Sequence, residues 1–140
     1  GHDGSLTTIH ANSPRDALSR IETMVLMSTS NIEQIAITKQ IASAIHLVVQ
    51  IRRFIDGVRR IESVSEITGM EQNIVTMQEI ASYVQQGISK EGKSVGYFRM
   101  HSVKPRFLSK AKEMGVQLSP SSLEALQQHP PTPPGDNRLG

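Results

Sequence analysis

The 140-residue sequence predicts an α/β fold, and three observations along the chain lead to that prediction. The stretch "SLTTIHA" is uncharged and rich in β-branched residues, so we predict a buried strand at Leu6–His10. Two segments with apolar residues at helical spacing follow, and after them the apolar period changes to two. The prediction is therefore a central strand, two helices and an antiparallel hairpin, with a small C-terminal extension.

The two helices are predicted at Pro14–Met27 and Ile32–Ile45. Ser13 suits the N-cap of the first helix, Pro14 suits its first helical position, and Asp16 lies where a capping box has its acidic residue. The sequence "SNIE" repeats the capping-box pattern at the start of the second helix. Both helices should present one apolar face to a sheet.

The strands of the hairpin are predicted at His46–Ile55 and Val58–Thr68, where apolar residues alternate or nearly alternate. Between them, Asp56-Gly57 is predicted as a two-residue turn in which both residues have positive φ. The sequence "GMEQN" reads as a turn, "IVTMQEIA" as a third strand and "SVGYFRM" as a further strand. The polar segment Gln85–Lys93 is predicted to be a linker.

The C-terminal part should hold a short helix that follows Pro105 and ends at Gly115, which suits the C′ position. Ser119-Pro120 repeats the pattern of a cap followed by proline before Leu123 and Leu126. Residues 127–140 are proline-rich, and we predict that they are disordered.

Composition excludes several classes of protein. Without cysteine the chain has neither disulfides nor cysteine metal sites. No apolar run reaches the roughly 20 residues that a membrane-spanning helix needs. The net charge of +2 is too small to indicate a nucleic-acid-binding protein by itself.

The sequence contains no G-x-x-x-x-G-K-[ST] loop, no G-x-S-x-G elbow and no HExxH motif. His2 and His10 do not have the spacing of a standard zinc site, although Asp3 could join them. Two interpretations of His10 remain open. It is either a strand-end histidine bonded to the backbone, or a ligand-binding residue beside a helix N-terminus, where anions bind.

The segment "GHDGSLTTIHANSPRDALSRIETM" resembles the histidine box of the type II/type IV secretion and pilus-assembly ATPases, most closely the CpaF-like branch. The resemblance continues through "QIASAIHLVVQ", "RFIDGVRRI", "EITGME" and "GYFRMHSVKPRF", and it covers nearly all of Gly1–Met114. It implies a RecA-like P-loop ATPase domain in a hexameric motor, located in the cytoplasm at the inner membrane, that drives pilus assembly or protein secretion.

By this resemblance the chain is the C-terminal half of the motor domain, downstream of the Walker A and Walker B segments. Residues 1–84 belong to the RecA-like domain, residues 85–126 to a linker and C-terminal extension, and residues 127–140 to the tail. ATP and Mg²⁺ are implied as cofactors of the full-length parent, and none is expected on the 140 residues alone, which should be inactive. The implied partners are five further copies and the inner-membrane platform proteins, without nucleic acid.

Residue by residue, the resemblance places His2 and His10 in the histidine box, near the γ-phosphate or a subunit interface, and gives them a catalytic role. Thr8, next to His10, and Arg20 are the implied nucleotide-binding residues, although Arg20 is equally well read as a solvated helix-face arginine. Four arginines on the predicted hairpin are either a charged, soluble hairpin end or a subunit contact. These are Arg52, Arg53, Arg59 and Arg60.

Two other classes of function stay open. A small non-catalytic binding or scaffold module would explain a domain without a phosphate-binding loop. A basic nucleic-acid-binding domain would explain the arginine hairpin and a pI near 9.2, although no aromatic residues alternate with the basic ones to support base stacking.

Overall fold

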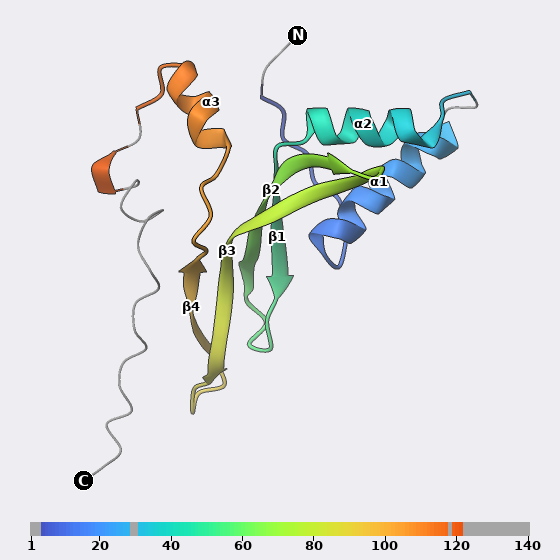
Figure 1. Ribbon diagram of the computed structural model, residues 1–140. Coiled ribbons are helices and arrows are strands. Elements are labelled where there is room, and N and C mark those ends of the chain that lie inside the picture. Colours follow the sequence, from blue (N-terminus) through green and yellow to red (C-terminus); the bar gives the residue numbers. More distant parts are fainter. Residues whose placement is uncertain (1–3, 29–30, 118, 122–140) are drawn as a thin grey trace. The chain divides into compact units, whose positions relative to one another are not determined.

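The computed structural model describes residues 4–28, 31–117 and 119–121 and confirms the α/β class (Figure 1). In chain order its elements are α1 (Pro14–Ser28), α2 (Gln34–Ala44), β1 (Leu47–Arg53), β2 (Arg59–Glu71), β3 (Ile74–Ile88), β4 (Ser94–Met100) and α3 (Phe107–Glu113). The four strands form one sheet in the order β1-β2-β3-β4, so that strands next to each other in the sequence are also neighbours in the sheet.

The chain divides into two compact units. Unit 1 consists of residues 1–50 and 65–78, and unit 2 of residues 51–64 and 79–140. Unit 1 contains α1, α2 and the β2–β3 turn, whereas unit 2 contains the β1–β2 loop, β4 and α3. The core of unit 1 consists of aliphatic side chains from both helices and from β2 and β3, namely Leu18, Ile37, Ile41, Ile67 and Val75.

The first helix follows the sequence prediction closely. The N–H of Asp16 donates to Ser13 Oγ over 3.1 Å, which confirms Ser13 as the N-cap. The carboxylate of Asp16 accepts the N–H of Asn12 at 2.9 Å rather than that of Ser13, so the reciprocal bond of the capping box is shifted by one residue.

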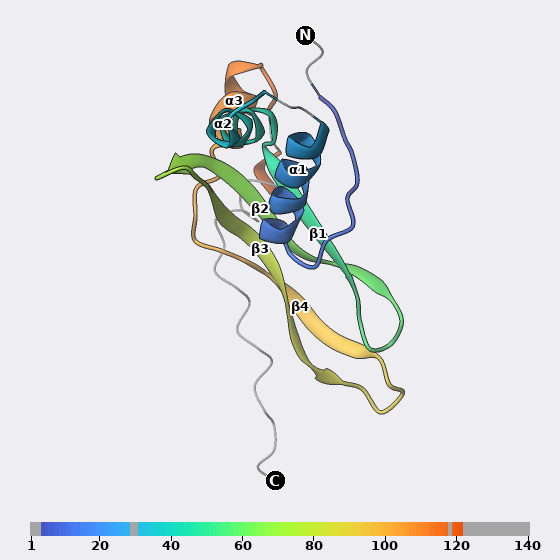
Figure 2. The same ribbon diagram turned by 90° about the vertical axis from the view of Figure 1, so that its right-hand side faces the viewer.

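The predicted strand Leu6–His10 is wrong. The segment is irregular (Figures 1 and 2). Leu6 is fully exposed. A strand needs a neighbouring strand to take up its backbone N–H and C=O groups, and in the described residues none pairs with this segment. Because β-propensity measures how well side chains fit a paired, half-buried surface, the β-branched residues alone do not make a strand here. The predicted fold therefore loses its central strand.

The second helix begins later than predicted. Glu33 is its N-cap, with φ −64° and ψ 140°, and its side chain makes no capping bond. The predicted capping box is therefore misplaced, because the acidic residue itself occupies the cap; Ser30 lies outside the described residues. The helix ends one residue before the predicted Ile45, which is its C-cap.

The predicted hairpin exists, but its loop differs. Phe54 N–H donates to the Val58 carbonyl at 2.9 Å, so that Ile55, Asp56 and Gly57 form a three-residue loop. Gly57 alone of the three has positive φ, at 76°. The predicted two-residue turn at Asp56-Gly57 is therefore wrong. Such a turn requires the left-handed conformation at both residues, whereas here only Gly57, the last residue of the three-residue loop, adopts it.

A two-residue turn with positive φ at both positions is found one hairpin later. Gln72 (φ 45°) and Asn73 (φ 69°) connect β2 to β3. The sequence prediction had a turn here over Gly69–Asn73, and the structure shortens it, because β2 continues to Glu71.

The segment Gln85–Lys93 is not an irregular linker. Its first four residues complete β3, in which Gln85, Gly87 and Ile88 pair with β4 around an irregularity at Gln86, and residues 89–93 form the loop of this hairpin. The hydrogen bonds between neighbouring strands join backbone groups and do not depend on apolar side chains. The polar end of β3 can therefore pair with β4. The predicted strand "SVGYFRM" is confirmed as β4.

The helix expected after Pro105 is confirmed as α3. Its end is closed by Val116 N–H donating to the Ala111 carbonyl at 2.8 Å and Gly115 N–H donating to the Lys112 carbonyl at 3.0 Å. This pair of bonds is a Schellman motif, and Gly115 (φ 74°) supplies the left-handed residue that it requires. The predicted segment at Leu123–Leu126 and the tail at 127–140 lie outside the described residues.

Candidate functional site

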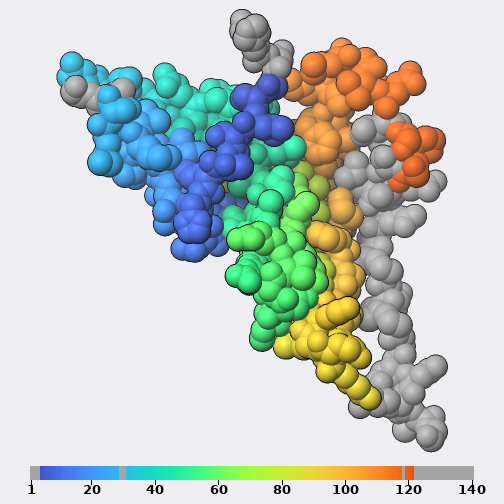
Figure 3. All heavy atoms as spheres, turned by 180° about the vertical axis from the view of Figure 1, so that it is seen from behind, coloured from blue at the N-terminus to red at the C-terminus, as the bar shows by residue number. Residues whose placement is uncertain are grey.

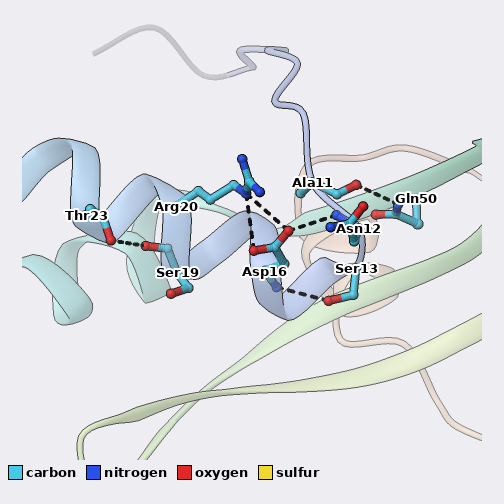
Figure 4. Close-up of polar contacts among 8 residues, drawn as sticks. All are labelled: Ala11, Asn12, Ser13, Asp16, Ser19, Arg20, Thr23 and Gln50. Atoms are coloured by element: carbon cyan, nitrogen blue, oxygen red, sulfur yellow. Dashed lines mark hydrogen bonds and ion pairs between the residues drawn. The ribbon is translucent and has the colours of Figure 1, made fainter.

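The segment that carries the predicted catalytic histidines lies at the N-terminal end of unit 1. His10 and Thr8 are both exposed, and Gln50 on β1 holds the segment in place by donating from Nε2 to the Ala11 carbonyl at 3.2 Å (Figure 4). His2 lies outside the described residues. The exposed side chain of His10 is accessible to a ligand or to another protein.

Asp16 lies at the centre of the polar contacts that follow this segment (Figure 4). Arg20 Nε donates to both of its carboxylate oxygens, at 3.2 and 3.1 Å, one helical turn further along α1. The N–H of Asn12 and, to a lesser extent, the side chain of Arg20 lower the pKa of Asp16.

Of the predicted site residues, the structure brings Arg20 to the Asp16 carboxylate. Arg20 is a half-exposed partner of Asp16, as the plainer interpretation of this arginine required. In the described residues no contact joins Thr8 to Arg20. This arrangement presents an exposed imidazole beside the N-terminus of a helix, where a negatively charged group is favoured.

The four arginines of the β1–β2 hairpin have different surroundings. Arg60 forms a bidentate pair with Asp56, with Nη1–Oδ1 and Nη2–Oδ2 distances of 2.8 and 2.7 Å. Arg52 pairs with Glu62 at 3.0 Å, and Arg53 Nε donates to the Gly57 carbonyl at 3.1 Å. Their guanidinium groups therefore stabilise the hairpin itself.

Arg59 is exposed, and the described residues contain no hydrogen bond or ion pair to it. Of the four arginines it is the one whose whole guanidinium is available to another molecule. The sequence alone could not separate it from its neighbour Arg60, because the difference depends on which side of the strand faces Asp56.

The interior of unit 2 depends on Phe54, which sequence reasoning missed. Its ring is 6% exposed and makes an edge contact with Tyr83, with ring centroids 5.1 Å apart. The guanidinium carbons of Arg52 and Arg60 lie 4.7 and 5.5 Å from its centroid. The sequence did contain a signal for this role of Phe54. In "RRFIDGVRR" two pairs of arginines flank an aromatic and an acidic residue, and arginine side chains pack on aromatic rings.

Asp56 is the second residue whose role was missed. Its side chain is only 5% exposed and accepts four hydrogen bonds. Two come from Arg60, and the others come from the N–H groups of Val58 at 3.1 Å and Ser94 at 2.9 Å. Arg60 and these N–H groups hold the pKa of Asp56 far below its ordinary value, so the carboxylate ties the β1–β2 loop to the start of β4.

We expect Asp56→Asn to lower the melting temperature at pH 7. Because the folded-state pKa of Asp56 is depressed, its contribution to stability is complete above the unfolded value near 3.8 and is lost as the pH falls towards the folded value. The gap in melting temperature between wild type and variant should therefore narrow between about pH 4 and pH 2. Thermal unfolding followed by circular dichroism at several pH values measures it.

Asp16→Asn is the matched control, since Asp16 is more exposed and has a weaker set of partners. Its variant should lose less stability at pH 7. A gap for Asp56→Asn that stays constant down to pH 2 would show that the ionised carboxylate is not what stabilises the loop.

A serine, a histidine and a glutamate meet on the other hairpin of unit 2. Ser82 Oγ and Glu79 Oε1 each lie 2.9 Å from Nε2 of His101. In a Ser-His-Asp triad the serine and the acid meet opposite nitrogens of the ring. Because both groups contact one nitrogen here, His101 links the end of β4 to β3 and does not activate the serine.

Other kinds of site find no support in the part of the chain that the structure describes. No group of three or more histidine, cysteine or acidic side chains is placed to hold a metal ion within residues 4–28, 31–117 and 119–121. Across the same residues, no helix combines the length and the apolar character needed to cross a membrane.

The fold and the exposed histidine segment define an α/β module with an anion-compatible helix N-terminus. The chain belongs to the type II/IV secretion system protein family, whose model matches residues 1–112. The match includes both histidines, α1, α2 and the complete four-stranded sheet. Among curated proteins, no relative matches the chain.

Proposed function

We propose that the chain is part of a hexameric, RecA-like ATPase motor of the CpaF-like branch, which powers pilus assembly or type II/IV secretion. The observation that carries the proposal is the family match over residues 1–112. The motor would work in the cytoplasm at the inner membrane, with platform proteins as its partners. In this motor, His10 would donate to the nucleotide's phosphates or to the neighbouring subunit.

The geometry around His10 supports this role. Its imidazole is exposed and precedes the Ser13-capped N-terminus of α1, where the helix dipole favours an anion. Arg20 lies one helical turn after Asp16, and the Asp16 carboxylate compensates part of the positive charge of Arg20. We propose His10 as the residue that contacts the phosphate side, with Arg20 and Thr8 as supporting groups.

We propose that ATP and Mg²⁺ are bound by the assembled motor and not by this chain alone. The chain has no G-x-x-x-x-G-K-[ST] loop, and its described acidic side chains form no cluster suited to a cation. The donor set present here therefore fits one side of a nucleotide site, and the phosphate loop and the Mg²⁺ ligands must come from elsewhere in a motor. No catalytic step is assigned to this chain by itself.

The 140-residue chain alone should not turn over ATP. Positioning and electrostatic stabilisation of the transferred phosphoryl group depend on the loop that this sequence lacks. The measurement is phosphate release with Mg²⁺ and ATP, before and after addition of a family motor whose phosphate-loop lysine has been replaced. Sustained turnover by the purified chain would contradict the proposal.

A chimera tests the function directly. Residues 1–112 would replace the matching segment of an intact, active family motor, and ATP turnover would be compared with that of the parent. Retained turnover supports the motor assignment, whereas a chimera that folds and assembles without turnover argues against it.

The nucleic-acid-binding alternative receives less support. Three of the four hairpin arginines bond to groups of their own chain, and the nearby ring of Phe54 is buried between two of them. No base could stack on that ring without displacing Arg52 or Arg60.

A further inference from the structure

The tip of unit 2 presents an aliphatic side chain among basic ones. Ile55 is at the apex of the β1–β2 loop and is 74% exposed, and Val58 beside it is 49% exposed. Arg53 and Arg59 flank the loop on the two strands. Figure 3 shows this green loop beside the yellow β3–β4 loop, which adds Lys90 and Lys93.

Hydrogen bonds within unit 2 restrain this tip before any partner binds. Asp56 accepts the N–H groups of Val58 and Ser94, and the loop is closed by the bond from Phe54 to Val58. An exposed apolar side chain on a fixed loop loses little conformational freedom on binding. The tip is therefore a preorganised apolar protrusion that could insert into a cleft on a partner.

Unit 1 has a recess of matching size and chemistry. A cleft of about 260 Å³ opens between α1, α2 and the β2–β3 turn, with Leu18, Ile41 and Val75 at its apolar base. An apolar cavity of about 150 Å³ is enough to bind a benzene-sized ligand. One isoleucine side chain therefore fits the cleft.

Charged side chains of both signs lie near the cleft. Glu22 and Arg15 line it, Glu33 precedes a lining residue of α2, and Glu71 precedes the turn that closes it. Over their described residues, unit 1 carries an excess of acidic side chains and unit 2 an excess of basic ones. The two units are therefore electrostatically complementary surfaces for association between copies.

We propose that the Ile55 tip of one copy docks into the α1–α2 cleft of a second copy, with Arg59 of the first facing Glu71 of the second. The contact is heterologous, because the two copies use different surfaces, and such contacts generate rings or filaments. The inference rests on the proposed assembly into a multimeric motor and assigns the residues of one of its contacts.

Disulfide trapping tests the contact cleanly, because the chain has no cysteine. A chain with Ile55→Cys is mixed with a differently tagged chain with Ser19→Cys, a residue that lines the cleft, in a glutathione redox buffer. Only a disulfide between two copies joins the two tags. We expect at least about tenfold more mixed dimer than with Ser43→Cys, an exposed α2 residue outside the cleft.

Charge reversal provides the second measurement. Arg59→Glu or Glu71→Arg alone should lower the yield of mixed dimer severalfold, and both changes together should restore it, whereas Arg99→Glu at the far end of β4 should have no effect. Equal yields from the Ser19 and Ser43 pairs, or an excess of the Ile55–Ile55 disulfide, would overturn the contact.

The two proposals can fail separately. Self-association by sedimentation without the Ile55–Ser19 disulfide removes this contact and leaves the motor assignment intact. A trapped dimer together with an inactive chimera confirms the contact and counts against the motor.

Discussion

Ile37→Ala is expected to lower the free energy of unfolding by about 2–5 kcal/mol, the range for removing a fully buried aliphatic side chain. Ile37 on α2 is 1% exposed and packs in the aliphatic core of unit 1 with Leu18 and Val75. The substitution removes apolar contacts and leaves a cavity, because neighbouring side chains fixed on helices and strands close it only in part. Denaturant unfolding followed by circular dichroism measures the change.

Ile74→Ala is the matched control, since Ile74 is 60% exposed in the same unit. It removes the same atoms without opening a buried cavity, so we expect less than about 1 kcal/mol. Similar losses for the two variants would mean that the described core of unit 1 does not carry the stability of the fold.

His10→Ala in the active chimera is expected to lower ATP turnover by about tenfold to a thousandfold, the range for removing one preorganised donor. Nucleotide affinity should fall much less, because the phosphate loop of the motor supplies most of it. Stability should hardly change, since His10 is exposed and outside any helix or strand. Turnover, nucleotide affinity and melting temperature are measured in parallel on the same preparations.

Ser5→Ala is the control on the same exposed segment. It should leave turnover unchanged. If His10→Ala also leaves turnover unchanged, or lowers it only together with a large loss of melting temperature, His10 has a structural role and the proposed contact with phosphate is wrong.

Local signals in the sequence predicted the elements that depend on neighbouring residues. Ser13 and Pro14 place the start of α1, because a cap acts within one helical turn. Gly115 marks the end of α3 through its left-handed conformation. The alternation of apolar residues likewise located β1.

Predictions that depended on distant partners were less accurate. Leu6–His10 has the composition of a strand and is irregular, because no described strand pairs with it. Gln85, Gly87 and Ile88 belong to a segment with the composition of a linker and are paired, because β4 lies beside them. Composition describes what a segment can do, and pairing depends on which backbone lies next to it.

The candidate site shows the same division. The sequence predicted His10, Arg20 and the arginine hairpin as binding residues, which stays a prediction. The match over residues 1–112 agrees with the family that the sequence resembles. The sequence did not show that Arg60 is committed to Asp56 while Arg59 is exposed. Adjacent residues on a strand point to opposite faces, so their roles differ as soon as one face is covered.

The sequence by itself determined the α/β class, the caps of the first and last helices, the position of the β1–β2 hairpin and the family. The tertiary structure decided which strands pair, that Asp56 and Phe54 organise the basic tip, and that a cleft opens beside α1 and α2. Caps and turns are set by a few consecutive residues, whereas pairing, burial and clefts arise between residues far apart in the chain. For this reason the second group could be read only from the folded protein.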